Sequence, residues 1–522
     1  MQNLLSARLD AAVEAIPRAY PGPGGAIAVL RHGEVLVRHA WGYANAERRI
    51  AFTPRTLFRV CSITKQFTCA VALDAHGDLS ALDDAVRARL PRLEAPAPSA
   101  TLLAHNQSGL RDYWAVAMLL GSPAEAPFGD VETGAIVGAT RSLQFAPGTR
   151  FSYVNQNFRM LGDIVAERAE MSFADLLRTR VFDRAGMETA FLAADTSAMP
   201  DGSTGYEGTQ AGGFRAAENR ILWTGDAGLG ASLDDMIAWE RHIDATRDDP
   251  GALYSRISAP VAFADGTPAT YGFGLGRSTT FGRASTGHGG GLRGWRSHRQ
   301  YVPAERLSVV VMFNHLANAS AAATDLLAAL LGETSPGPDP GLPPPDWLGA
   351  YIEPETGLAA RVEAGPPGQV RLRFGHAPDT LDLRPDGSAG RETGPRLRPA
   401  EGGLWLDRPG DNASTRLTPL APPTGARDVT GRYRCGEFGA ELTVTGAGGV
   451  LYGAFSGALG QGRMELLDPV GADVWALPCH RALDHTPPGD WTLAFRRDAG
   501  GAVTGVTVGC WLARGLGYVK AG

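Results

Sequence analysis

The stretch Cys61-Ser62-Ile-Thr-Lys65-Gln-Phe-Thr-Cys-Ala-Val-Ala-Leu73 decides how this chain of 522 residues is interpreted. Its apolar spacing predicts a helix around 65–76. Residues three apart on a helix lie on one face, so Ser62 and Lys65 are expected side by side. The partial positive charge at a helix N-terminus favours a developing alkoxide and lowers a lysine pKa. We therefore predict Ser62 as a nucleophile and Lys65 as the base that takes its proton.

Lysine is almost absent elsewhere. Of 49 basic residues 47 are arginine, and the two lysines are Lys65 and Lys520, the latter almost at the C-terminus. Arginine cannot act as a base near neutral pH, whereas a partly buried lysine can. The competing interpretation is a helix-capping Ser62 beside a solvated Lys65, and the scarcity of lysine argues against it.

Two further stretches carry polar groups suited to acyl transfer. In Tyr153-Val-Asn155 the phenol can move a proton and the amide can hydrogen-bond a substrate. In Thr286-Gly-His288-Gly-Gly-Gly-Leu-Arg293 the glycines let substrate backbone approach closely. We expect His288 to line the substrate site and the Gly291 N–H to form an oxyanion hole with that of Ser62. Taken alone, each stretch also fits a packed tyrosine or a surface turn.

Proline-rich stretches divide the chain. We predict a catalytic domain over 1–332, a linker over 333–346, a β-barrel over 347–418, a second linker over 419–428 and a second barrel over 429–522. In the first part, strands at both ends with helices between them indicate an α/β core with an antiparallel sheet.

The last two parts look like copies of each other. Gly349, Tyr351, Val362 and Gly375 recur as Gly431, Tyr433, Val444 and Gly457, each 82 residues later. Short alternating segments and Gly-rich turns in both parts are typical of all-β sandwiches or barrels.

Composition excludes several classes of function. A formal net charge of −6 gives no field that attracts nucleic acid or an anionic membrane. No stretch has the roughly 20 apolar residues of a membrane span, and charges near the N-terminus leave no room for a secretory signal. Five irregularly spaced cysteines indicate neither a metal site nor a disulfide framework. We expect a cytoplasmic protein that needs no cofactor or metal.

Ser-x-x-Lys, Tyr-x-Asn and the Gly-rich strand, in this order, resemble the penicillin-recognising serine hydrolases over about residues 20–330. Three other stretches look like accessory loops of that superfamily: Asn106-Gln-Ser-Gly-Leu110, Gly225-Asp-Ala-Gly228 and Tyr271-Gly-Phe-Gly274. Within it, the chain is most similar to the D-stereospecific aminopeptidases. That likeness rests on Cys61-Ser62-x-x-Lys65-Gln-Phe-Thr-Cys-Ala70, Asn106 to Trp114, Gly287-His-Gly-Gly290 and Gly509-Cys-Trp-Leu-Ala-Arg514.

The resemblance implies a β-lactamase-like catalytic domain followed by two antiparallel lipocalin-like β-barrels, in a homodimer. It implies release of a small N-terminal D-residue (D-Ala, D-Ser, D-Thr or Gly) from peptides, amides and esters. It also implies that a loop of the last barrel supplies an Asp for the substrate ammonium. Asp484 is the candidate, with Asp490 second; the alternative is an ordinary surface loop.

His288 supports this subdivision. β-Lactamases and D,D-carboxypeptidases typically carry Lys at this position, where its charge meets the substrate carboxylate. Histidine is mostly neutral near pH 7, which weakens recognition of that carboxylate. We therefore expect β-lactams to bind only weakly or to inhibit, without fast turnover. Other interpretations remain: an esterase with the same Ser62, Lys65 and Tyr153, a D,D-peptidase or β-lactamase-like enzyme, or a binding protein with an inactive hydrolase domain.

Overall fold

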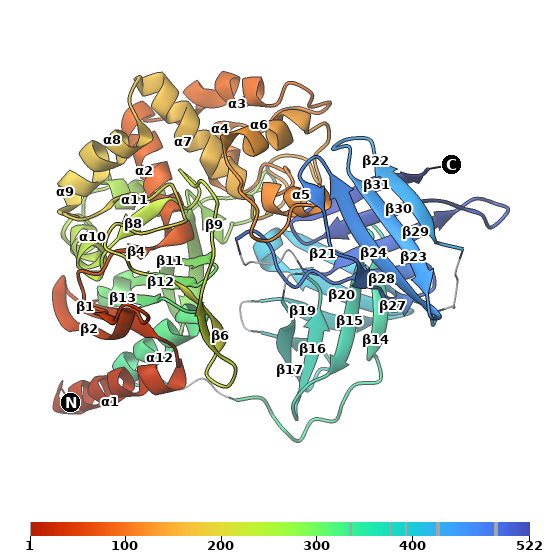
Figure 1. The fold of residues 1–522 in the computed structure, drawn as a ribbon. Helices are drawn as coiled ribbons and strands as arrows, with labels where there is room; N and C mark the ends of the chain where they lie inside the picture. The colour runs from red at the N-terminus through yellow and green to blue at the C-terminus, as the bar shows by residue number, and fades with distance from the viewer. Residues whose placement is uncertain are drawn as a thin grey trace.

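An antiparallel sheet of eight strands forms the centre of the N-terminal part (Figure 1). The computed structural model describes residues 2–333, 337–375, 377–391, 394–423, 428–484 and 489–521. The spatial order of the sheet is β3 (Ile50–Ala51), β2 (Glu34–Asn45), β1 (Gly24–Arg31), β13 (Leu307–Phe313), β12 (Trp295–Val302), β11 (Arg283–Leu292), β10 (Leu275–Thr280) and β9 (Tyr271–Gly272). The expected α/β core with an antiparallel sheet is confirmed.

Helices cover both faces of this sheet, because successive residues of a strand point to opposite sides. On one face α1 (Gln2–Ala19) and α12 (Ala319–Leu331) cover Ile27, Val29 and Val309. The alternate residues of the same strands join a larger core on the other face. The helices beyond α1 and α12 are α2 (Thr64–His76), α3 (Asp83–Arg89), α4 (Ala100–Ala104), α5 (Tyr113–Leu119), α6 (Asp130–Ala139), α7 (Asn155–Ala169), α8 (Phe173–Leu177), α9 (Asp183–Ala185), α10 (Leu233–Ala245) and α11 (Leu253–Ile257).

Helix α2 is buried all round from Thr64 to Leu73. It packs against α7 and α11, which explains why its sequence is apolar or small on every side. Short two- and three-stranded pieces complete this part: β4 (Phe58–Arg59), β8 (Leu229–Ala231) and β5 (Phe191–Leu192) form one, and β6 (Tyr206–Thr209) and β7 (Gly213–Ala216) form the other.

The next part is a closed antiparallel barrel, which we call the first barrel. Its last strand pairs with its first, and its interior is filled mainly by leucine, valine and alanine side chains. The strands are β14 (Gly349–Glu353), β15 (Leu358–Ala364), β16 (Gln369–Arg373), β17 (Asp379–Leu383), β18 (Ala389–Gly390), β19 (Arg396–Ala400), β20 (Gly403–Arg408) and β21 (Ala413–Pro419).

The C-terminal part, which we call the last sheet, is the second antiparallel barrel expected from the sequence, and it is only half closed. Its ladder runs β25, β24, β23, β22, β31, β30, β29, β28, β27 and stays open, with β26 paired to β24. Only Leu467 separates β26 from β27, so the chain itself joins the two edges. The strands are β22 (Gly431–Cys435), β23 (Glu441–Ala447), β24 (Val450–Gly457), β25 (Gly460–Gln461), β26 (Glu465–Leu466), β27 (Asp468–Gly471), β28 (Val474–Leu477), β29 (Trp491–Arg497), β30 (Val503–Cys510) and β31 (Ala513–Lys520).

The repeat seen in the sequence has the same register in both parts. Gly349 lies opposite Val362, and Gly431 lies opposite Val444. The two repeated tyrosines also bond alike, since each hydroxyl donates to the carbonyl four residues before it. These bonds are Tyr351 to Trp347 at 2.7 Å and Tyr433 to Val429 at 2.6 Å. Equal register and equal bonds support a duplication.

The domain boundaries read from the proline-rich stretches stay predictions, and residues 334–336 and 424–427 of the expected linkers lie outside the described residues. Within the described part of the chain, no helix combines the length and apolar character needed to cross a bilayer.

Candidate active site

Ser62 lies in a short 3-10 turn, Cys61–Ile63, directly before α2. Cys61 holds a left-handed conformation with φ of 52°, which is costly for a residue with a side chain and is often found beside functional groups. Cys61 and Ile63 are fully buried while Ser62 keeps partial solvent access. The turn therefore presents the Ser62 hydroxyl at the surface of an otherwise buried segment.

Lys65 is fully buried, with its amino group directed at three oxygen atoms. The Nζ atom donates to the Ser62 hydroxyl at 3.0 Å, to the Asn155 side-chain oxygen at 2.9 Å and to the Asp226 carbonyl at 2.7 Å. Burial lowers the pKa of Lys65 to about 8, against the opposing effect of nearby carboxylates. A fraction of Lys65 is thus neutral near physiological pH and able to accept a proton.

Tyr153 completes this group. Its ring centroid lies 5.0 Å from the Lys65 Nζ atom, and its hydroxyl hydrogen-bonds Ser62. Burial raises the pKa of Tyr153 well above its usual value, and the hydrogen bond with Ser62 lowers it. Asn155 opens α7, so Tyr153 occupies the extended segment that leads into that helix.

A buried carboxylate that sequence reasoning did not assign, Asp112, orients Asn155. One oxygen of Asp112 accepts from the Asn155 backbone N–H at 2.6 Å and from its side-chain amide at 3.0 Å. This leaves the Asn155 oxygen turned toward Lys65. Burial raises the pKa of Asp112 to about 6. The signal was present in the accessory stretch that begins at Asn106, which sequence reasoning used only as a family resemblance.

The other accessory stretches also hold Lys65. Gly274 has a φ of 72°, and a Cβ there would lie 2.4 Å from the Lys65 carbonyl carbon. Gly225 fits as closely against α7, where a Cβ would lie 2.4 Å from the Phe158 oxygen. Only glycine permits these approaches, which bring the Asp226 carbonyl onto the Lys65 amine.

His288 faces the same group from β11. Its ring hydrogen-bonds the Tyr271 hydroxyl at 3.0 Å and the Gly289 carbonyl at 2.5 Å. A carbonyl only accepts, so the nitrogen facing Gly289 carries the proton and the other accepts from Tyr271. Burial, helped by the charge of Lys65, lowers the pKa of His288 to about 3. The imidazole is neutral at physiological pH, as the sequence argument predicted.

The glycine run of β11 lies against the segment that precedes Ser62. A Cβ on Gly290 would lie 2.1 Å from the Val60 carbonyl oxygen. Leu292 opposes Trp295 across a two-residue turn, and Gly291 opposes Arg296. In an antiparallel pair, bonded and non-bonded positions alternate from such a turn, so the Gly291 N–H is directed away from β12. That geometry suits the predicted oxyanion role.

Asp484 belongs to the connection 478–490 between β28 and β29, which we call the Asp484 loop; residues 485–488 lie outside the described part. Asp484 is 7% exposed, and its negative charge raises the pKa of Lys65 and of Tyr153. Asp490 is exposed; the pKa of the Cys479 thiol is raised by burial and, to a smaller degree, by the charges of Asp490 and Asp484. The charge of Asp484 thus reaches the group around Ser62.

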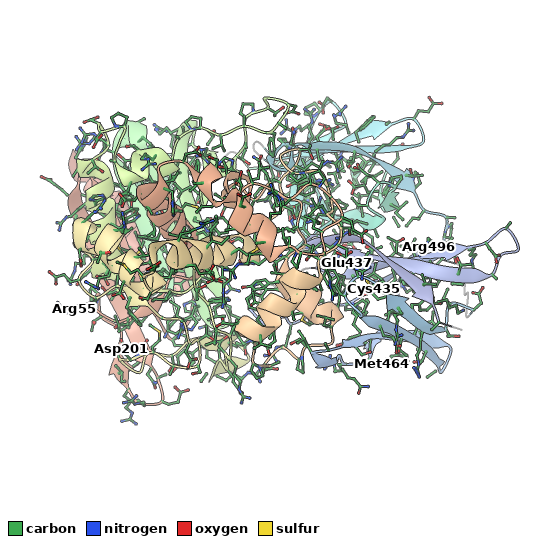
Figure 2. The ribbon with its side chains drawn as sticks, turned by 90° about the horizontal axis from the view of Figure 1, so that it is seen from above. Arg55, Asp201, Cys435, Glu437, Met464 and Arg496 are labelled. Carbon is green, nitrogen blue, oxygen red and sulfur yellow. The ribbon has the colours of Figure 1, made fainter. Side chains whose placement is uncertain are left out.

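The last sheet is attached to the catalytic part through two backbone carbonyls and one carboxylate. The Leu512 carbonyl accepts from the Asp112 N–H at 2.9 Å, and the Arg514 carbonyl accepts from the Arg111 side chain at 2.9 Å. Glu437 accepts from the backbone of Ser142 at 3.1 Å, and its label lies where the helices meet the last sheet in Figure 2. The stretch 509–514, read from the sequence as a family likeness, is a docking segment behind Asn155.

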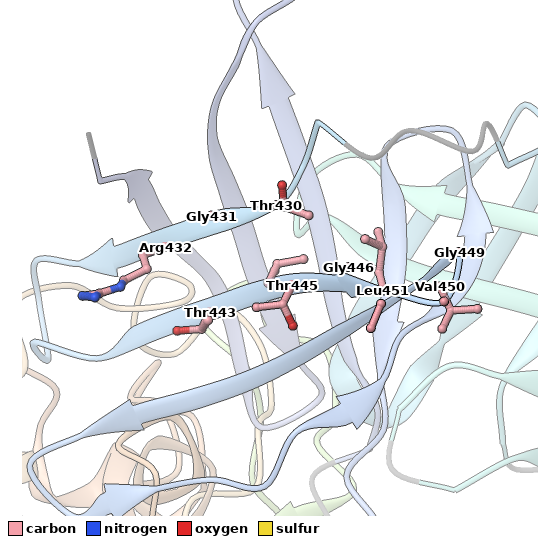
Figure 3. A pocket seen from close by; sticks show the side chains of 12 residues that line it. Thr430, Gly431, Arg432, Thr443, Thr445, Gly446, Gly449, Val450 and Leu451 are labelled. Carbon is pink, nitrogen blue, oxygen red and sulfur yellow. The ribbon is translucent and has the colours of Figure 1, made fainter.

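A separate hollow of about 640 Å³ lies on the last sheet, lined by threonines and glycines of β22 to β24 (Figure 3). Its lining, residues 430–432 and 443–451, contains none of the residues that surround Ser62. Across the described residues, no group of three or more His, Cys, Asp or Glu is arranged to hold a metal ion.

Comparisons with known proteins agree with this architecture. The sequence matches the β-lactamase family over residues 9–333 and the family described as D-aminopeptidase, domain B, over residues 341–519. A protein of Gluconobacter oxydans (strain 621H) named D-aminopeptidase is 57% identical over 526 residues, covering 100% of both chains. A D-aminopeptidase of Brucella canis is 46% identical over 520 residues, again covering 100% of both.

Two solved structures share the fold at low identity. The octameric penicillin-binding protein homologue from Pyrococcus abyssi has a TM-score of 0.54 with 22% identity, over 79% of this chain and 99% of that one. A β-lactamase/D-alanine carboxypeptidase from Pseudomonas syringae has a TM-score of 0.50 with 18% identity, over 64% and 99%. With full-length relatives at 57% and 46% identity, the chain belongs to the D-aminopeptidase family of β-lactamase-like hydrolases.

Proposed function

We propose that this enzyme releases a small N-terminal D-residue from amides, peptides and esters through an acyl-enzyme on Ser62. The main support for this proposal is the hydrogen bond to Ser62 from Lys65, whose pKa is lowered by burial. Neutral Lys65 takes the hydroxyl proton as the Ser62 oxygen attacks the substrate carbonyl. The backbone N–H groups of Ser62 and Gly291 stabilise the oxyanion that forms.

Collapse of the tetrahedral intermediate expels the amine, which takes a proton through Tyr153 or Lys65. Water then attacks the ester on Ser62, and the same groups return the proton to the serine oxygen. Asn155 hydrogen-bonds the substrate, and neutral His288 lines the site without offering a cation to a carboxylate.

Asp484 is proposed to bind the substrate ammonium. An ammonium that leaves bulk water needs a paired anion, and Asp484 acts electrostatically on Lys65 from a buried position. This requirement separates an aminopeptidase from an esterase or a D,D-peptidase, neither of which must recognise a free amine.

The deciding experiment measures hydrolysis of D-Ala-p-nitroanilide, its L-isomer and a short-chain nitrophenyl ester, with mass spectrometry of the trapped enzyme. We expect the D-anilide to be preferred and the adduct to lie on Ser62. Equal rates on both anilides would contradict the stereochemical assignment. Hydrolysis of the ester alone would favour an esterase. Efficient hydrolysis of penicillin would favour a β-lactamase-like enzyme, and the absence of any adduct would favour a binding protein.

The homodimer, the cytoplasmic location and inhibition by β-lactams remain predictions. Light scattering on the purified chain, cell fractionation and competition by a penicillin against D-Ala-p-nitroanilide test them in turn.

A further inference from the structure

The turn between β11 and β12 carries an arginine at the base of the Asp484 loop. Arg293 is 1% exposed and follows Gly291 by two residues. Its backbone is fixed, because the Asn219 amide donates to the Arg293 carbonyl at 3.0 Å. The next residue, Gly294, has a φ of 85°, and a Cβ there would lie 2.5 Å from the Gly205 carbonyl carbon. Arg293 is therefore part of the rigid frame of the site.

The guanidinium of Arg293 joins three separate segments. It donates to the Ala482 carbonyl of the Asp484 loop at 2.8 Å, to the Ala124 carbonyl at 2.6 Å and to the Glu218 carbonyl at 2.9 Å. Ala482 is buried and precedes Asp484 by two residues. A planar fork with several fixed donors can satisfy these carbonyls together.

Two carboxylates are shared between Arg293 and a second arginine that belongs to the loop. Glu125 lies 3.3 Å from Arg293 and 2.6 Å from Arg481. Glu207 lies 3.6 Å from Arg293 and 3.3 Å from Arg481. The exposed Arg215 approaches Glu207 at 3.9 Å from outside the loop. The Asp484 loop is thus tied to the catalytic part by carbonyl bonds and by alternating charges.

We propose that Arg293, Glu125, Glu207 and Arg481 form an ionic clamp that sets the distance between Asp484 and the Ser62 group. Arg293 acts through Asp484 and does not touch the reacting atoms, so it is a positioning residue for substrates that carry an ammonium. The clamp builds on the proposed role of Asp484. It assigns the placement of that carboxylate to the turn directly after β11, the strand that offers the Gly291 N–H.

The kinetic test uses Arg293→Lys, which keeps the charge but loses the fork, and the double variant Arg293→Lys/Asp484→Asn. The readout is kcat/KM for D-Ala-p-nitroanilide divided by kcat/KM for an acetyl nitrophenyl ester. Loss of hydrogen bonds to buried carbonyls predicts that Arg293→Lys lowers this ratio roughly tenfold, mainly through the KM of the anilide. Because Arg293 acts through Asp484, the ratio in the double variant is expected to be no lower than the ratio in Asp484→Asn alone. An equal loss on both substrates, or additive losses, would overturn the clamp.

Two milder variants guard against misfolding. Glu125 is 37% exposed, so Glu125→Gln is expected to fold and to lower the ratio about threefold, in the range of a part-exposed ion pair. Arg215→Gln removes an exposed charge near the same Glu207 without touching the loop, and its ratio is expected to match the wild type. Thermal melting of each variant separates a local from a global effect. If the ratio in Glu125→Gln is no lower than the ratio in Arg215→Gln, the ion pairs of Glu125 do not hold the loop and the clamp is contradicted.

A second readout does not depend on the substrate. Trypsin cuts after arginine, and a clamped Arg481 is protected. Arg293→Lys and Glu125→Gln are expected to be cut at the Arg481–Ala482 bond faster than wild type or Arg215→Gln. Unchanged cleavage in a folded Arg293→Lys would overturn the clamp whatever the kinetics. An unchanged ratio in Asp484→Asn combined with faster cleavage would leave the clamp standing and refute the proposed ammonium role.

Discussion

The first barrel and the last sheet start from the same strand register but end in different relations to the active site. In the first barrel β21 pairs with the first strand, β14, and in the last sheet β31 pairs with the first strand, β22. Counting backwards along the chain from β21 and from β31, β18 and β19 correspond to β28 and β29. The connection between β18 and β19 covers residues 391–395, whereas the Asp484 loop covers 478–490. The longer connection is the one that reaches the Ser62 group. Two parts that begin with the same strand register can therefore differ in function through one loop.

The first barrel contacts both of its neighbours. It bonds the catalytic part directly, since the Asp411 carbonyl accepts from the Phe151 N–H at 3.2 Å, and it also contacts the last sheet. Ala359 donates to the Thr492 hydroxyl at 3.0 Å, and Phe374 packs against Trp511. Both partners belong to the last sheet, close to the docking segment 509–514. The first barrel thus braces the last sheet, and the last sheet in turn contacts the site.

The largest expected effect lies in the catalytic part, outside both duplicated regions. Ser62→Ala and Lys65→Arg should each lose several orders of magnitude in kcat, on anilide and ester alike, because arginine stays protonated. This loss on both substrates is the reference for every loop variant. Retention of more than about a tenth of the activity by Lys65→Arg would remove lysine from the role of base.

Shortening the Asp484 loop makes the last sheet resemble the first barrel. Deletion of residues 480–488 removes the candidate anion and is expected to lower kcat/KM for D-Ala-p-nitroanilide roughly a hundredfold, a typical cost of an unpaired buried charge. Ester and β-lactam binding should improve relative to the anilide because the cleft opens. Steady-state kinetics with both substrates check this. Parallel losses would mean that the loop is structural.

A smaller effect is expected at His288. Lysine at this position would offer a cation to a β-lactam carboxylate, and a charged hydrogen bond of this kind predicts roughly tenfold tighter binding. Hydrolysis of amine-bearing substrates should weaken in His288→Lys. Inhibition constants for a penicillin against ester hydrolysis measure the change, and unchanged inhibition would argue that His288 does not face the carboxylate.

The smallest effect concerns pH. Lys65 is neutral above its pKa, so ester acylation should rise with pH and level off above about 8. The Asp484 charge raises the pKa of Lys65, so in Asp484→Asn the rising limb should move to lower pH. A substrate without an amine keeps its own titration out of the profile. An unmoved limb would place Asp484 too far from Lys65 to influence it.

Much of the catalytic part could be predicted because its signals are local. Ser62 and Lys65 share the first turn of one helix, and the continuous apolar run 307–313 forms a fully buried strand. The role of Asp112 was missed because it depends on α7, more than forty residues away, being packed against the stretch that starts at Asn106.

The last sheet shows a feature that the sequence could not predict, the closure of a barrel. Its sequence pattern indicated a barrel, but whether the ladder closes depends on how β26 and β27 pair at a corner, which alternation alone does not determine. The contact between Arg293 and Ala482 joins positions 189 residues apart. Neither residue lies in a pattern that indicates the other.

We propose that the last sheet selects the substrate while the catalytic part performs the chemistry. The most direct test measures kcat/KM for D-Ala-p-nitroanilide and for an acetyl nitrophenyl ester. The proteins compared are the wild type, Asp484→Asn and a control variant in the first barrel, Glu401→Gln, which changes an exposed turn residue. We expect Asp484→Asn to raise KM for the anilide at least tenfold, the scale of a lost charge partner. This increase should far exceed any change in the KM of the ester, and Glu401→Gln should change neither value. Equal loss on both substrates in Asp484→Asn, or no loss on either, would contradict the proposal.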